Sequence, residues 1–383
     1  MNILISSIVD VENSAPQRIH HIIRHLSEKH SITVLCINDY WKSSQVDSRH
    51  YYRNDLDGYG DLEIRYITEK NYSPILQELL SFRLIDAKFD RDFDVLFNYN
   101  TLISGYYLAR KLNIPMVYDM ADDLPAMVAH SPQVARMLRS FGGRFAEMLL
   151  HKNFRFSEVI TCTSNLFKER YRIPDNKFIL LPNGVDSTLF AARQNHLKDQ
   201  LGLQDSFVLG YVGVLREWVD FEPVCGALQF FDDVKLLIVG EEGRLEENKD
   251  LIKGYGLQNQ VAFLGTIPHC QVPEYISVMN ACLIPFTKDK ISQSAVPIKL
   301  FEYLACERPV ISTSLEGIRD IIGDRILYAD TPQEYISQIR RLLSGGVPGE
   351  LVREGREFVC DNYSWNTIVQ RLETELEKVC ETV

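Results

Sequence analysis

The residues with the clearest chemical potential lie in one short segment, residues 292–312, SQSAVPIKLFEYLACERPVIS. A helix is predicted over residues 298–305, because Pro297 suits its start and apolar residues recur along one face. Lys299 and Glu302 are three residues apart and therefore share the other face. The free N–H groups of a first helical turn bind phosphate, and Lys299 would add a positive charge there. Glu302, one turn deeper, can accept hydrogen bonds from both hydroxyls of a ribose.

The same pair has a simpler interpretation as an exposed salt bridge, which contributes only about 0.2–0.5 kcal/mol and needs no ligand. The elements around the pair decide how it would be placed. Short apolar segments alternate with amphipathic segments along the whole chain, which predicts strand–helix–strand units and parallel sheets. The pattern restarts near residue 186. We therefore expect two doubly wound α/β domains, over residues 1–186 and 187–360, and a C-terminal helix over 361–383 that returns to the first domain.

Several short motifs occur in a fixed order through the second half of the chain. They are LLPNGVDSTLF (180–190), LGYVGVLREWVDF (209–221), LLIVGEEG (236–243) and VAFLG (261–265), followed by the 292–312 segment. This ordered set resembles the retaining, family-four type of glycosyltransferase, in the subset that has a PxKxxEY motif. The resemblance implies the GT-B fold, in which two Rossmann-like domains face a central cleft. It also implies that a nucleotide-sugar donor binds the C-terminal domain and the acceptor binds the N-terminal domain.

On the donor side, the resemblance assigns the leaving diphosphate to Lys299, with Arg216 as the nearest further cation, and the ribose to Glu302. The first of two glutamates usual in this family is replaced by Ser294. The remaining donor-binding candidates are Val296, Pro297, Gly213, Gly240 and Thr266.

On the acceptor side, the segment YDMADDLP (118–125) ends a predicted strand. The resemblance makes Asp119 and Asp122 the candidates that orient the acceptor hydroxyl, with Arg18 and Asn183 beside them. Two other interpretations remain for this segment: a divalent cation held by Asp122 and Asp123, and aspartates that cap a helix. We expect no metal, because the charge of the diphosphate would be balanced by Lys299, Arg216 and the helix N-terminus.

The resulting expectation is a hexosyltransferase that moves a sugar from a nucleoside diphosphate to a hydroxyl with retention, in surface-glycan or glycolipid synthesis. Two alternatives keep the same fold: a catalytically inactive binding or regulatory subunit, and a sugar-nucleotide epimerase or hydrolase. A nicotinamide dehydrogenase is disfavoured, because no GxGxxG follows the first strand.

Charge and composition limit the partners. The chain of 383 residues has a formal net charge of −11, and its acidic C-terminal half disfavours nucleic acid as a partner. No apolar run reaches the roughly 18 residues of a membrane span, and the N-terminus is not typical of a signal peptide. The eight scattered cysteines are typical of a cytoplasmic protein with reduced thiols. Residues 136–155 predict either a basic helix held peripherally at the inner membrane face, near a lipid-linked or glycan acceptor, or a core helix with a solvated basic face.

Overall fold

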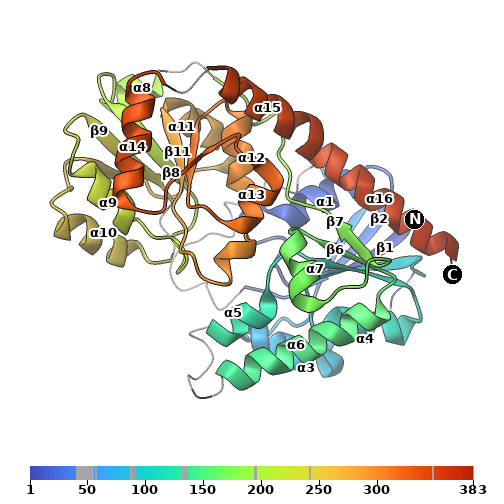
Figure 1. The fold of residues 1–383 in the computed structure, drawn as a ribbon. Helices are drawn as coiled ribbons and strands as arrows, with labels where there is room; N and C mark the ends of the chain where they lie inside the picture. Colours follow the sequence, from blue (N-terminus) through green and yellow to red (C-terminus); the bar gives the residue numbers. More distant parts are fainter. Residues whose placement is uncertain are drawn as a thin grey trace. The chain divides into compact units, whose positions relative to one another are not determined.

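A computed structural model describes residues 1–39, 56, 58–86, 89, 91–130, 137, 139–193, 196–240, 243–346 and 349–382. The chain divides into two compact units (Figure 1). Unit 1 comprises Met1–Pro182 and Trp365–Val383, and unit 2 comprises Asn183–Ser364. Each unit has its own parallel sheet and its own apolar core.

Unit 1 contains a seven-stranded sheet with the order β3-β2-β1-β4-β5-β6-β7, in which every pairing is parallel. Its strands are β1 (Asn2–Ser7), β2 (Ser31–Cys36), β3 (Leu62–Tyr66), β4 (Val95–Tyr99), β5 (Met116–Met120), β6 (Val159–Cys162) and β7 (Phe178–Leu180). Its helices are α1 (Arg18–Ser27), α3 (Pro74–Leu84), α4 (Ser104–Leu112), α5 (Leu124–His130), α6 (Arg139–Phe156), α7 (Asn165–Tyr171) and α16 (Trp365–Thr382).

The helices of unit 1 divide between the two faces of this sheet. Right-handed crossovers between parallel strands place the helix of each crossover on a face set by the direction in which the chain moves. The chain moves one way from β1 to β2 and the other way from β4 to β7. Helix α1 therefore covers one face, where it packs against α16, and α3, α4 and α6 lie on the opposite face (Figure 1).

Unit 2 contains a six-stranded sheet with the order β10-β9-β8-β11-β12-β13, again with every pairing parallel. Its strands are β8 (Phe207–Val212), β9 (Val234–Val239), β10 (Val261–Phe263), β11 (Ala281–Ile284), β12 (Val310–Ser312) and β13 (Leu327–Tyr328). Its α-helices are α8 (Leu197–Gln200), α9 (Glu222–Leu228), α10 (Leu245–Gly254), α11 (Val272–Val278), α12 (Ile298–Ala305), α13 (Glu316–Ile322), α14 (Pro332–Leu343) and α15 (Gly349–Tyr363).

The strand pattern of the sequence is confirmed, because buried parallel strands are nearly continuous apolar runs and are easy to recognise. Helices α12 and α14 begin and end where their apolar periodicity does. Helices α5, α7 and α13 have only seven residues each, which is too short for apolar periodicity to predict them. The basic helix predicted over residues 136–155 corresponds to α6, which begins at Arg139, while residues 136 and 138 lie outside the described part of the chain.

Candidate functional site

The carboxyl edge of the second sheet is formed by two glycine turns that lie against each other. Gly213 follows β8 with φ of 130°, and Gly240 follows β9 with φ of 128°. Both values lie in the region that side chains rarely adopt. A Cβ atom on Gly240 would lie 2.3 Å from the carbonyl oxygen of Gly213, so the two turns approach as closely as backbone allows. The two turns therefore pack backbone against backbone, and neither contributes a side chain to this edge.

Lys299 extends from the first turn of α12 toward these glycines. Its Nζ lies 3.9 Å from the ring centroid of Tyr211 and 5.8 Å from that of Phe286. A Cβ atom on Gly213 would lie 2.6 Å from this Nζ. The aromatic faces attract the ammonium group, but burial lowers the pKa of Lys299 to about 7, and the negative charge of Glu302 opposes that shift only in part. The Lys299 amino group is thus held in a fixed position, gains or loses its charge near neutral pH, and forms no ion pair with the described residues.

Glu302 lies one turn further along α12, beside a histidine that the sequence analysis did not select. His269 Nε2 lies 3.5 Å from Glu302 Oε1, and the two side chains are 20% and 12% exposed. The His269 ring also makes an edge contact with Phe190, at 5.4 Å between centroids. The helix is fixed to the sheet by Tyr303, whose hydroxyl accepts a hydrogen bond from the Val212 N–H at 2.8 Å. Glu302 is therefore held in place with one partner and with part of its surface free.

The loop before α12 is held by polar contacts within unit 2. Ser294 is buried, and its hydroxyl donates to the Ile291 carbonyl at 3.0 Å. Asn183 Nδ2 donates to the Val296 carbonyl at 2.7 Å, while Asn183 Oδ1 is buried and has no hydrogen-bond partner among the described residues. Asn183 therefore touches the donor-side loop, whereas the sequence analysis placed it with the acceptor residues. Pro297 occupies the N-cap position of α12.

Two other donor-side candidates are exposed. Arg216 lies in the loop after β8, close enough to Tyr211 that its charge opposes the rise in the pKa of that hydroxyl caused by burial. Thr266 follows the turn after β10. The structure thus brings Lys299, Gly213 and Gly240 together, with Glu302 on the same helix, and adds Tyr211, Phe286 and His269 to them.

In unit 1, Arg18 and Asp119 form a buried ion pair. The guanidinium donates from Nε to Asp119 Oδ2 at 2.8 Å and from Nη2 to Oδ1 at 2.9 Å, and the two side chains are 3% and 0% exposed. Thr161 donates to the same carboxylate, and Arg18 Nη1 donates to the Pro182 carbonyl at 2.8 Å. Burial alone would lower the pKa of Arg18, but Asp119 raises it overall. In this arrangement Asp119 holds Arg18 and presents no surface to an acceptor.

The neighbouring aspartates differ from each other. Asp122 is exposed at the carboxyl end of β5. Asp123 is buried, accepts a hydrogen bond from the Ala126 N–H at 3.0 Å, and lies 2.6 Å from Arg170 Nη1. Asp123 is therefore the helix-capping residue of α5, one of the interpretations that the sequence left open. Within the described ranges, no group of three or more His, Cys, Asp or Glu could hold a metal ion.

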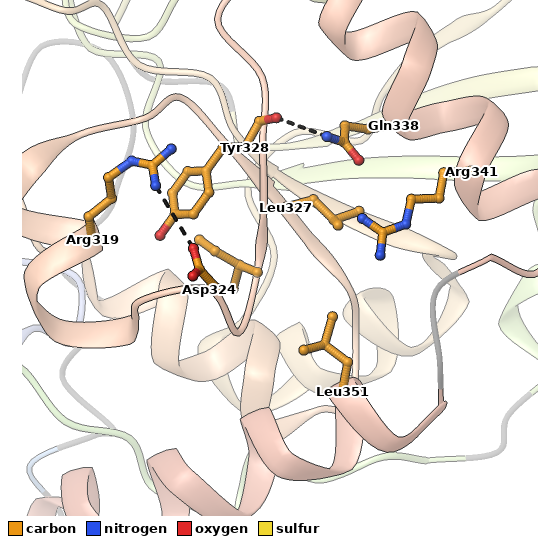
Figure 2. A pocket seen from close by; sticks show the side chains of 8 residues that line it. Arg319, Asp324, Leu327, Tyr328, Gln338, Arg341 and Leu351 are labelled. Carbon is orange, nitrogen blue, oxygen red and sulfur yellow. Dashed lines mark hydrogen bonds and ion pairs between the residues drawn. The ribbon is translucent and has the colours of Figure 1, made fainter.

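A separate cavity of about 470 Å³ lies elsewhere in unit 2 and is lined by residues of α13, β13, α14 and α15. Figure 2 shows Arg319 beside Tyr328, with its Cζ 3.8 Å from the ring centroid, and Gln338 donating to the Tyr328 carbonyl. None of the residues of the candidate site lines this cavity.

Part of the chain is similar to a known protein family. Residues 193–357 match the family model described as "Glycosyl transferases group 1". This segment is therefore similar to group 1 glycosyltransferases. The matched range contains Gly213, Gly240, Lys299 and Glu302, so the residues brought together at the sheet edge all lie within the segment that is similar to this family.

Two curated relatives and two solved structures extend this comparison. The chain is 24% identical over 267 residues to a protein named as a teichuronic acid biosynthesis glycosyltransferase, TuaH of Bacillus subtilis, which covers 67% of this chain and 65% of that protein. It is 24% identical over 231 residues to N-acetyl-alpha-D-glucosaminyl L-malate synthase of Bacillus anthracis, covering 57% and 59%. The alignments thus span less than two thirds of either relative.

The fold is shared with solved structures over nearly the whole chain. HepE of Anabaena in complex with UDP and glucose superposes with a TM-score of 0.74 at 16% identity, covering 99% of this chain and 100% of that one. Sucrose-phosphate synthase of Thermosynechococcus elongatus superposes with a TM-score of 0.76 at 16% identity, covering 100% of both. These superpositions confirm the expected GT-B fold.

Proposed function

We propose that this chain is a retaining hexosyltransferase that moves a sugar from a nucleoside diphosphate to a hydroxyl group of an acceptor. The observation that carries the proposal is the position of Lys299, fixed in the first turn of α12 beside the bare backbone of Gly213 and Gly240. The family match supports the reaction class. The names of the relatives and the UDP complex of HepE support a nucleotide-sugar donor.

In the proposed reaction, the bond between the anomeric carbon and the diphosphate oxygen breaks, and a bond forms to the acceptor oxygen on the same face of the sugar. The acceptor proton passes to the leaving phosphate, so no protein base is required. Negative charge grows on the diphosphate as the bond breaks. Positive groups fixed in advance around that charge lower the barrier. In this proposal Lys299, the N-terminus of α12 and Arg216 would supply that positive charge.

We further propose that the donor ribose binds Glu302. The side chain is held near His269, keeps a free carboxylate oxygen, and lies on the polar face of α12 below the phosphate position. A charged carboxylate binds two ribose hydroxyls more strongly than a neutral group would, because hydrogen bonds to an ionised oxygen are stronger. Ser294, Val296, Pro297 and Thr266 would line the sugar side of the same pocket.

The proposed reaction needs no metal ion, since Lys299 and Arg216 supply the positive charge. The proposed acceptor is a growing surface glycan or a lipid-linked sugar, met in the cytoplasm at the inner membrane face. The acceptor-side candidate that remains exposed is Asp122, whereas the Arg18 guanidinium is bound to Asp119 and to the Pro182 carbonyl. All eight cysteines are free, which is consistent with a reducing compartment. No described helix is long and apolar enough to span a bilayer.

The test is a panel of UDP-, GDP- and ADP-sugars, first screened by thermal shift and then assayed for nucleotide release with and without lipid-linked and soluble acceptors. We expect one nucleotide class to stabilise the protein and its release to depend on an acceptor. Release without acceptor would instead identify a hydrolase or epimerase. Binding without any turnover would identify a regulatory subunit.

A further inference from the structure

Two helices of unit 1 expose large apolar side chains along their outer sides. On α3 these are Leu76, Leu79 and Phe82, which are 38%, 42% and 48% exposed. On α6 these are Phe141, Phe145 and Met148, which are 71%, 38% and 45% exposed. Spacings of three and four residues place each set in one stripe along its helix. Several apolar residues of α6 are therefore exposed, whereas the interpretation of this segment as a core helix required them to be buried.

The two stripes belong to one face of the unit. Helices α3 and α6 are linked through the Leu102 backbone just before α4: its N–H donates to Glu78 of α3 at 3.0 Å and its carbonyl accepts from Asn153 of α6 at 2.9 Å. Figure 1 shows α3, α4 and α6 together on the side of the first sheet opposite α1 and α16. We call the outer side of α3, α4 and α6 the three-helix face.

The three-helix face is strongly basic in a chain that is acidic overall. Its helices contain seven cationic residues and two acidic ones, Glu78 and Glu147, and Glu78 is buried. The cationic residues are Arg83, Arg110, Lys111, Arg139, Arg144, Lys152 and Arg155. These three helices therefore carry a formal net charge of +5, whereas the whole chain carries −11. Arg136, which belongs to the same basic segment, lies outside the described residues.

We propose that the three-helix face docks on an anionic lipid bilayer. Stripes of exposed apolar side chains on helices of one sheet face mark an interaction surface. Bulky apolar groups accompanied by Arg and Lys match the boundary between acyl chains and anionic headgroups. Phe141, Phe145 and Phe82 would enter the acyl boundary, while the cations contact the headgroups. Docking here would bring the enzyme to the membrane that carries a lipid-linked acceptor. The identity of that acceptor rests on the proposed function, whereas the docking surface does not.

The experiment is flotation of the full chain with phosphatidylcholine vesicles that contain either 30% phosphatidylglycerol or none. We expect the wild type to float with anionic vesicles at low salt and not with neutral ones. The combined variant Arg144→Glu, Lys152→Glu, Arg155→Glu should lower the bound fraction at least about tenfold. The variant Phe141→Ser, Phe145→Ser should lose the binding that survives at moderate salt.

The matched control is Lys249→Glu, Lys253→Glu, Lys235→Glu, which makes the same charge change on unit 2 and should float like the wild type. Nucleotide binding, measured by calorimetry, separates this proposal from the proposed function, because all the variants should retain it. The docking proposal is overturned if the wild type stays in the soluble fraction with every vesicle, or if the three-helix variants float as well as the control. It is also overturned if the wild type is a dimer that Phe141→Ser, Phe145→Ser makes monomeric, since a second copy would then cover the face.

Discussion

The Nζ of Lys299 lies 3.9 Å from the centroid of the Tyr211 ring, over its face. Burial lowers the pKa of this lysine to about 7, far below the roughly 10.4 of a free lysine. The amino group therefore changes charge in the neutral range, directly beside the place proposed for a diphosphate. This relationship makes the candidate donor site sensitive to pH, and it gives Tyr211 a role that the sequence alone did not indicate.

Donor binding should take up a proton near pH 8, where most of the Lys299 population is neutral, because the diphosphate favours the charged form. Calorimetry of nucleotide binding in two buffers with different ionisation enthalpies measures that uptake. We expect affinity to fall as pH rises through 7. In Lys299→Arg the guanidinium stays charged, so both the uptake and the pH dependence should vanish. Proton uptake of equal size in Lys299→Arg would show that another group is responsible.

The same shift predicts how the stability of the protein depends on pH. Below pH 7 the lysine is charged in both the folded and unfolded states, so it contributes no pH dependence. Between pH 7 and about 10.4 the unfolded chain binds the extra proton, so stability relative to a Lys299→Met variant should rise with pH. Calorimetric melting of both proteins at several pH values tests this. Parallel melting profiles would mean that Lys299 titrates like an exposed lysine.

Tyr211 should act as a positioning residue for Lys299. Tyr211→Phe keeps the ring under the ammonium and should retain most of the turnover. Tyr211→Leu removes the aromatic face and should lower kcat more than it changes KM, by about two- to thirtyfold for a contact of about 0.5–2 kcal/mol. The pH profile of Tyr211→Leu should also shift. An equal loss in both variants would instead point to the hydroxyl, which donates to the Val214 carbonyl at 2.9 Å.

The ion pair between Arg18 and Asp119 should matter for stability more than for chemistry. Asp119→Ala would leave a buried guanidinium without its partner, which costs about 3–5 kcal/mol. Asp122→Asn, at an exposed position, should change the free energy of unfolding by less than about 0.5 kcal/mol. Chemical denaturation of both variants measures the difference. Near-native stability of Asp119→Ala would show that water or another group compensates Arg18.

The sequence was sufficient for the parts that local patterns determine. Apolar periodicity and Pro297 located α12 to the residue, and the spacing of Lys299 and Glu302 placed both on its polar face. It was insufficient where a contact joins distant segments. Asp119 meets Arg18 from 101 residues away, and His269 reaches Glu302 from a different loop. The residues next to Asp119 in the sequence do not indicate that its carboxylate is bound to the buried guanidinium of Arg18. The TIPH segment after β10 likewise carries no motif that selects His269.

If α12 forms the donor site, changes on this helix should weaken nucleotide binding, and calorimetric titration of the preferred nucleoside diphosphate measures this most directly. Glu302→Gln should weaken binding by about 1.5–3 kcal/mol, roughly 10- to 150-fold, because a charge-assisted hydrogen bond to the ribose is lost. Glu357→Gln, an exposed glutamate on α15 of the same unit, should bind like the wild type. Equal affinity of the wild type, Glu302→Gln and Glu357→Gln would contradict the account, since Glu302 would then be only a partner of His269 at the surface of the domain.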